Sequence, residues 1–143
     1  GLAAAADYAI ACEGAEIKLS ELAVGIGPFV VGPAVERKLG LSAFSQLAID
    51  AGNFRPADWA RRKGLFAELH ETVEGMDESI VRLSNTLAKS SPEAIKELKS
   101  IFWEGTEHWD ELLLQRAAIS GKLILSDYSK NFIANFKAKQ KTS

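Results

Sequence analysis

The sequence predicts a mixed α/β chain that is mostly helical, with two or three short strands near its N-terminus. Two observations place the strands: residues 8–12 are apolar and almost uncharged, and residues 16–19 alternate polar and apolar side chains. A third observation predicts the helices, because apolar residues recur at helical spacing from Met76 almost to the end of the chain. We therefore expect strands only in the front part of the chain.

The composition bounds the class of protein. A chain of 143 residues that is 47% hydrophobic and 25% charged suits one globular domain. A net charge of −2 argues against a general nucleic-acid binder, and no apolar run approaches the roughly 20 residues of a membrane span. The single cysteine, Cys12, excludes an internal disulfide and fits a reducing compartment, so we expect a cytoplasmic protein. Because natural chains rarely begin Gly-Leu-Ala-Ala, we expect Gly1 to mark a truncation.

The first elements are short. Residues 1–6 are strong helix formers apart from the glycine, and they predict a helix. Glu13-Gly14 predicts a turn between the two strands. Three glycines and two prolines in residues 25–33 predict a loop.

Two further helices and the loops beside them follow. Residues 34–39 predict a helix closed by Gly40, and Ser42 is placed to cap the next helix, which runs to about residue 50. After a loop at 51–56, residues 57–63 predict a helix that Gly64 stops. A short apolar stretch follows it.

The back half reads as a series of helices. Ser91, followed by a proline, is expected to cap one helix, and Thr106 and Ser126 are expected to cap the next two. Apolar stripes run along these helices: Ile80, Leu83, Leu87 and Ala88; Trp109, Leu112, Leu113 and Ala117; Phe132 and Phe136. Such stripes form a core or an interface.

Glu21 is the first candidate for chemistry. It follows a short predicted strand and opens a loop of small residues. A carboxylate at a strand end beside flexible backbone suits proton transfer. The alternative is a solvated loop carboxylate, which spacing alone favours.

Four motifs, taken in order, reverse that preference. They are Ser20-Glu21; Gly25-Ile26-Gly27-Pro28; Ala57, Ala60, Gly64 and Leu65; and Ser91-Pro92-Glu93-Ala94 with Lys96, and the apolar opening 1–13 precedes them. Their order and spacing resemble the crotonase family, the enoyl-CoA hydratase/isomerase group. The resemblance implies a crotonase-like spiral fold of short strands and helices, of which this chain holds the second half. Residues 1–70 would then be a remnant of the spiral core with the active-site turn, and 71–143 a helical oligomerisation region that builds trimers.

The resemblance also implies a function. Such a parent enzyme acts on an acyl-CoA thioester, with Glu21 moving a proton at the α-carbon through an enolate-like intermediate. Gly1 and the turn of Gly25, Ile26, Gly27 and Pro28 would contact the substrate. Lys130 or Lys137 would lie near the CoA phosphates, and no metal or redox cofactor is implied.

One departure from the family pattern bears on the reaction. Hydratases of the family use a second glutamate where this sequence has Gly1, and a glycine cannot transfer a proton. The family's oxyanion-hole donors would also precede Gly1. We therefore expect the fragment itself to be inactive, and its parent to favour a one-base reaction. The second hypothesis is a non-catalytic helical assembly fragment.

The remaining reactive side chains predict no further site. His70 and His108, the two histidines, lack the spacing of a helical zinc site. Cys12 stands in an apolar strand, as an inert core thiol does.

Overall fold

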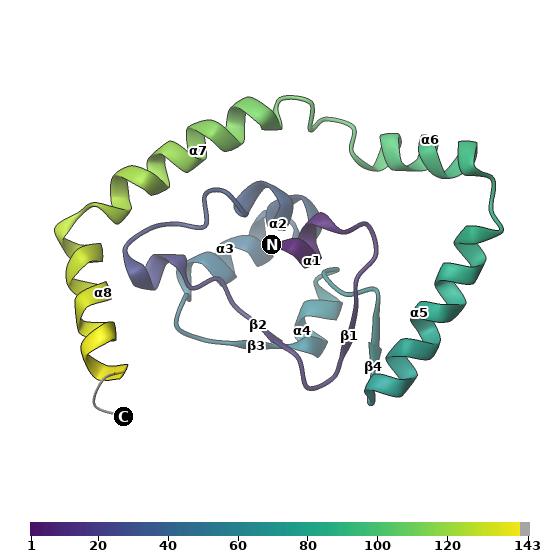
Figure 1. Cartoon of the computed structure of the whole chain (residues 1–143), viewed down its shortest axis with the longest axis horizontal. Helices are drawn as coiled ribbons and strands as arrows, with labels where there is room; N and C mark the ends of the chain where they lie inside the picture. Colours follow the sequence, from purple (N-terminus) through teal and green to yellow (C-terminus); the bar gives the residue numbers. More distant parts are fainter. Residues whose placement is uncertain (141–143) are drawn as a thin grey trace.

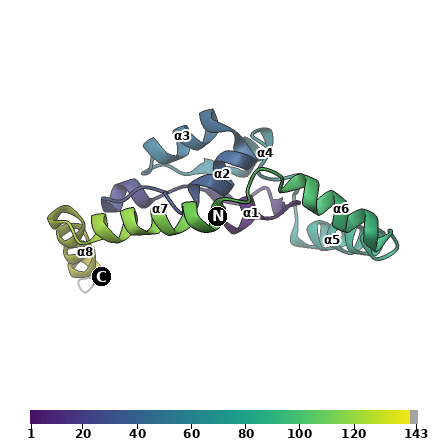
Figure 2. The same cartoon turned by 90° about the horizontal axis from the view of Figure 1, so that it is seen from above.

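The computed structural model describes residues 1–140, which form a body and an arc of helices around it (Figure 1). The body contains α1 (Leu2–Ala5), β1 (Ile10–Cys12), β2 (Glu16–Ile17), the 3-10 helix η1 (Glu21–Val24), α2 (Gly32–Leu39), α3 (Leu41–Ile49), β3 (Arg55–Pro56), α4 (Ala57–Arg62) and β4 (Glu68–His70). The arc contains α5 (Val73–Ala88), α6 (Pro92–Phe102), α7 (Trp109–Ile124) and α8 (Asp127–Gln140). Figure 2 shows α2, α3 and α4 on one side of the layer that the arc forms. Within residues 1–140, no helix is long and apolar enough to cross a membrane.

Two pairs of short strands organise the body. β1 pairs in parallel with β4, so that Cys12 lies opposite His70, and β2 pairs antiparallel with β3. The two predicted strands are confirmed, although each is shorter than expected. Two more strands lie where none was predicted. β3 falls within the predicted loop at 51–56, and β4 begins within the apolar stretch after α4. β3 contains Pro56, and β4 places Glu68 and His70 around one leucine, so pairing rather than propensity makes them strands.

The core of the body is built largely from small residues. The core cluster comprises Ala4, Ala11, Leu19, Val35, Leu47, Ala57, Ala60, Leu65 and Phe66. Ala57 and Ala60 have no exposed surface, which lets α4 approach β2 and β4 closely. A larger side chain at either position would overpack this contact.

Two predicted helix caps are confirmed. Ser91 Oγ accepts a hydrogen bond from the Ala94 amide at 3.3 Å, at the start of α6. Ser126 Oγ accepts one from the Ser129 amide at 3.3 Å, at the start of α8. Each hydroxyl satisfies an amide that the first turn of a helix leaves unpaired.

Two other predicted caps are wrong. α3 already begins at Leu41, which places Ser42 inside its first turn. α7 begins only at Trp109, because the Thr106 hydroxyl donates to the carbonyl of Trp103 at 2.7 Å and closes a turn instead. For Thr106, a local alternative for the hydroxyl defeats the capping pattern, whereas for Ser42 the helix begins one residue before it.

A polar network around Glu68 joins β4 to α5 and to the segment before β1. The Glu68 carboxylate accepts hydrogen bonds from the Tyr8 hydroxyl at 2.6 Å, from Arg82 Nη2 at 2.8 Å and from the Ser79 hydroxyl. His70 Nε2 lies 3.2 Å from the same carboxylate. These partners, the Ser79 hydrogen bond first and the Tyr8 hydrogen bond second, lower the pKa of Glu68 to about 2.

The carboxylate of Asp7 attaches the arc to the front of the body. Asp7 accepts hydrogen bonds from Lys99 Nζ and from Trp103 Nε1, both at 2.6 Å and both from the α6 region. The Lys99 hydrogen bond is the main cause that lowers the pKa of Asp7 below its usual value. Lys38 of α2 donates to the carbonyl of Asp7 at 2.8 Å. One residue therefore joins two elements that lie far apart in the sequence.

Replacing Glu68 by glutamine is expected to remove an acid-sensitive part of the stability. Folding lowers the Glu68 pKa from 4.5 to about 2, so the ionised carboxylate stabilises the fold fully above about pH 4.5. That contribution is lost as the pH falls from there through about 2. Urea unfolding at several pH values should therefore show a shallower decline in the free energy of unfolding for Glu68→Gln than for the wild type. Glu13→Gln, at an exposed turn, is the control. Equal slopes in the wild type and Glu68→Gln would contradict the network.

Candidate active site

Glu21 does not end the second strand, contrary to the prediction. β2 ends at Ile17, and Glu21 is the first residue of η1. The chain leaves the strand pair because Leu19 turns into the core and Ser20 adopts a helical backbone conformation. The carboxylate therefore stands at the start of one 3-10 turn and not in a long helix.

The Glu21 side chain is half-buried, and the surroundings of one of its carboxylate oxygens are unusual. Oε2 has almost no exposed surface, and no group within residues 1–140 forms a hydrogen bond with it. Buried polar atoms are nearly always paired, so an unpaired one requires an explanation. A carboxylate oxygen that is kept free to accept a proton from a ligand is one such explanation.

The turn after Glu21 folds back onto it. The Ile26 amide donates to the Glu21 carbonyl at 3.1 Å, and the Gly25 amide donates to the Leu22 carbonyl at 3.1 Å. Gly25 has a φ of 86°, a left-handed conformation that favours glycine. Gly27 and Pro28 are buried, and the predicted loop is confirmed at these positions. The turn thus fixes the backbone of Glu21 from its own sequence neighbourhood.

Gly1 lies in a different place, where it lines an apolar pocket of about 350 Å³. It is the N-cap of α1, and its neighbours in the pocket wall include Lys18, Leu19 and Phe54. Lys18 Nζ stands 4.2 Å from the centre of the Phe54 ring. The residues that line this pocket include neither Glu21 nor the turn 25–28. The predicted site residues therefore do not share one cavity, although Leu19 of the wall is close to Glu21 in sequence.

The first turn of α8 brings one of the two predicted lysines towards the Glu21 turn. α8 packs on η1, and Tyr128 and Ser129 approach Gly25 directly. Lys130 is the next residue and is exposed. Lys137 is also exposed but lies two turns further along α8, roughly 10 Å away along the helix axis. Lys130 is the better placed of the two.

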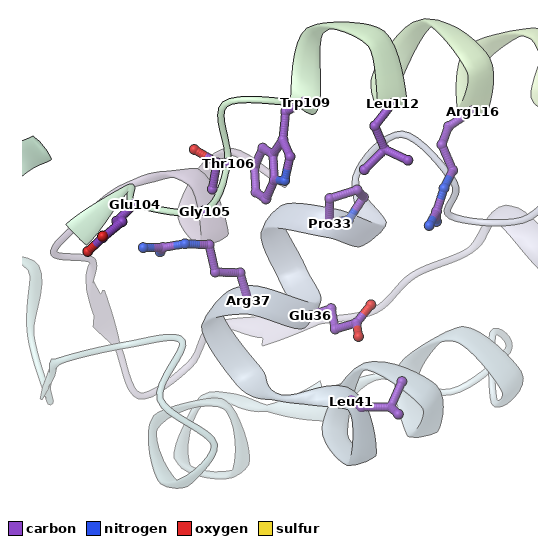
Figure 3. Close-up of a pocket in the computed structure, with 10 residues that line it drawn as sticks. All are labelled: Pro33, Glu36, Arg37, Leu41, Glu104, Gly105, Thr106, Trp109, Leu112 and Arg116. Carbon is purple, nitrogen blue, oxygen red and sulfur yellow. The ribbon is translucent and has the colours of Figure 1, made fainter. Parts of the chain in front are cut away.

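A groove that the sequence did not predict lies between α2 and α7 (Figure 3). It has a volume of about 460 Å³, and Trp109 and Leu112 reach down from α7 towards Pro33. Arg37 and Arg116 line it as well, together with acidic residues. The predicted apolar stripe on α7 thus faces the body in part, and mixed charge at its edges favours no single ligand class.

The other reactive residues have ordinary surroundings. Cys12, predicted to be an inert core thiol, is half-buried in β1, and its thiol lies 3.9 Å from the Met76 sulfur. No group of three or more His, Cys, Asp or Glu side chains in the described part of the chain could hold a metal ion.

Comparison with known proteins places this geometry in a family. The model of the family described as enoyl-CoA hydratase/isomerase matches residues 1–142. The chain belongs to this family. No curated protein sequence gave a match.

Solved structures support the same assignment at the level of the fold. An enoyl-CoA hydratase/isomerase from Pseudoalteromonas atlantica T6c is 19% identical with a TM-score of 0.86, over 96% of this chain and 56% of that one. An enoyl-CoA hydratase from Mycobacterium avium is 24% identical with a TM-score of 0.84, over 96% and 54% of the two chains. A carnitinyl-CoA hydratase from Mycobacterium avium is 22% identical with a TM-score of 0.82, again over 96% and 54%.

Two facts follow from these likenesses. The predicted crotonase-like fold is confirmed, since all three structures of enoyl-CoA or carnitinyl-CoA hydratases superimpose on nearly the whole chain. This member of the enoyl-CoA hydratase/isomerase family spans little more than half the length of those structures.

Glu21→Gln is expected to leave the free energy of unfolding at pH 7 unchanged, or to raise it by about 1 kcal/mol, because the buried Oε2 has no hydrogen-bond partner within residues 1–140 to lose. Glu68→Gln, which removes a carboxylate with several partners, should lower the stability under the same conditions. Urea unfolding of both variants measures the contrast. A loss above about 1 kcal/mol for Glu21→Gln would show instead that this carboxylate is structural.

Proposed function

We propose that this chain is part of an enzyme that moves a proton at the α-carbon of an acyl-CoA thioester, with Glu21 as the acid and base. The observation that carries the proposal is the buried Oε2 of Glu21, which has no hydrogen-bond partner within residues 1–140. Glu68, a structural carboxylate of this fold, differs from Glu21 because several donors form hydrogen bonds with it. Membership of the enoyl-CoA hydratase/isomerase family supplies the class of substrate.

The proposed reaction needs one carboxylate and a polarised carbonyl. Hydrogen bonds to the thioester oxygen stabilise an enolate-like intermediate, which makes the α-hydrogen acidic enough to transfer. Glu21 takes that proton and, in an isomerisation, returns it at another carbon of the acyl chain. Every step is a proton transfer or an addition of water, so we expect no metal or redox cofactor.

The position of Gly1 favours one of the two reactions of the family. Hydration in the family uses a second glutamate, and Gly1 stands at its place in the motif order. Glycine has no side chain to hold a proton. We therefore infer that the enzyme favours a one-base reaction such as the movement of a double bond.

We further infer that the chain corresponds to the second half of such an enzyme, in the cytoplasm. The order of the motifs supports the second half, and the share of 54% to 56% that the chain covers of its solved relatives fits a half of such a protein. The turn from Gly25 to Pro28 would then contact the substrate. The exposed Lys130, with Lys137 behind it on α8, would attract the CoA phosphates as a mobile positive charge. Gly1 would line the neighbouring apolar pocket.

The isolated chain is expected to show no hydration of crotonyl-CoA and no isomerisation of a 3-enoyl-CoA, because the oxyanion donors implied by the family belong to the other half. Turnover by the isolated chain that Glu21→Gln abolishes would contradict the assignment to a second half. In the enzyme that contains both halves, Glu21→Gln should lower kcat by about 100-fold or more. Glu13→Gln, at an exposed turn, is the matched control. Full activity of Glu21→Gln in that enzyme would overturn the proposed role of Glu21.

A specific observation favours the second candidate function, a helical assembly module. The helices of the arc expose large apolar side chains, each 38% to 74% accessible: Leu98, Ile101, Leu114, Leu125, Phe132 and Phe136. Trp103 and Trp109 are not part of this surface, since their rings pack edge to face at 5.8 Å. The division into a core, 1–70, and an oligomerisation region, 71–143, stays a prediction, and its last three residues lie outside the described part.

The chain is expected to form oligomers through the arc, with a trimer as the family's arrangement, because burying apolar surface gains about 25 cal/mol per Å². The double variant Leu114→Asp and Phe136→Asp should shift the mass found by light scattering at micromolar concentration towards the monomer. Ile49→Asp on α3 is the control, because Ile49 is 75% exposed and Leu114 is 74% exposed. A monomeric wild type would refute the assembly, and dissociation by Ile49→Asp alone would move the interface to the body.

A further inference from the structure

The first turn of α8 lies directly against the turn that follows Glu21. A Cβ atom built on Gly25 would lie 2.5 Å from Cδ1 of Tyr128 and 2.6 Å from Oγ of Ser129. Real Cβ atoms do not approach other atoms so closely. Only a glycine at position 25 therefore permits the contact between α8 and η1.

The side of this contact that α8 provides is firmly held. Ser129 has no exposed surface, although most of α8 is exposed. Its hydroxyl donates to the carbonyl of Leu123 at the end of α7, at 3.1 Å, and its amide donates to Ser126 Oγ at 3.3 Å. Tyr128 is 64% exposed, yet one edge of its ring lies on Gly25. Tyr128 and Ser129, at the corner between α7 and α8, thus form the surface on which Gly25 packs, and we call these two residues the seat.

On the other side of the contact, the backbone at Gly25 belongs to the turn that begins at Glu21. The amide of Gly25 donates to the Leu22 carbonyl, and the amide of Ile26 donates to the carbonyl of Glu21, both at 3.1 Å. The backbone that the seat touches is therefore the backbone that closes the turn of Glu21. A displacement of Gly25 would break these hydrogen bonds and release the start of η1.

We infer that Tyr128 and Ser129 are positioning residues for Glu21, so that the C-terminal helix sets the geometry of the carboxylate. They act through Gly25 and do not touch the reacting atoms. The inference rests on the proposed function for its catalytic meaning, while the mechanical link can be measured without any substrate. This positioning role belongs to Tyr128 and Ser129 alone, and the exposed remainder of α8 does not share it.

The test compares four variants of the chain by amide hydrogen exchange, with the Ile26 amide as reporter. Tyr128→Ala removes the ring, and Gly25→Ala drives a methyl group into the seat, so both should speed exchange at Ile26 by about tenfold. Tyr128→Phe keeps the ring edge and should restore the wild-type rate. Gly105→Ala controls for backbone strain, because Gly105 has a φ of 85° and nothing within 4 Å of its Cβ position. It should leave Ile26 unchanged.

Two further readouts separate positioning from general destabilisation. The carboxyl carbon resonance of Glu21 should shift in Tyr128→Ala and not in Tyr128→Phe. In the enzyme that contains both halves, Tyr128→Ala should lower kcat with little change in KM. Exchange at Ile26 within about twofold of wild type in Tyr128→Ala, or equal acceleration by Gly25→Ala and Gly105→Ala, would overturn the inference. Full activity of Glu21→Gln would overturn the proposed function alone, and the exchange result would stand.

Discussion

The architecture depends on a polar junction at two consecutive residues, Asp7 and Tyr8. Asp7 binds Lys99 and Trp103 near the end of α6, and the Tyr8 hydroxyl binds the Glu68 carboxylate. Through Glu68 the junction also reaches Ser79 and Arg82 of α5. The first half of the arc is thereby tied to the segment between α1 and β1. These polar bonds add to the packing of α5 on β1 and β4, while many apolar residues of the arc face outward.

A second attachment, at Gly25, holds the other end of the arc. It differs in kind from the first, since it relies on close packing against Tyr128 and Ser129 and not on charge. Charged junctions tolerate small displacements, whereas a contact that leaves no space for a methyl group does not. The chain therefore uses its more exacting contact beside the candidate catalytic residue.

Two glutamates in this fold have opposite surroundings. Glu68 is surrounded by donors, and its pKa is held at about 2, as expected of a carboxylate that stabilises the structure. Glu21 keeps a buried oxygen without a partner in the described residues. A buried oxygen without a hydrogen-bond partner lowers the stability of the fold, and packing does not explain why it is present. Its place at the start of η1, beside a rigid turn, makes it the group most suited to a ligand.

The sequence by itself determined much of this protein. Local patterns predicted β1, β2 and most helices, because apolar periodicity and capping residues such as Ser91 act over a few neighbours. The order and spacing of the motifs from Ser20 to Lys96, taken together, indicated the family, because motif spacing is a property of the chain alone. The tertiary structure decided the rest. β3 and β4 exist only through partners far away in the sequence. Ile17 pairs with Arg55, 38 positions away, and Ile10 pairs with Glu68, 58 positions away. The seat for Gly25 likewise comes from α8, and no local pattern records that two distant segments will meet without room for a methyl group.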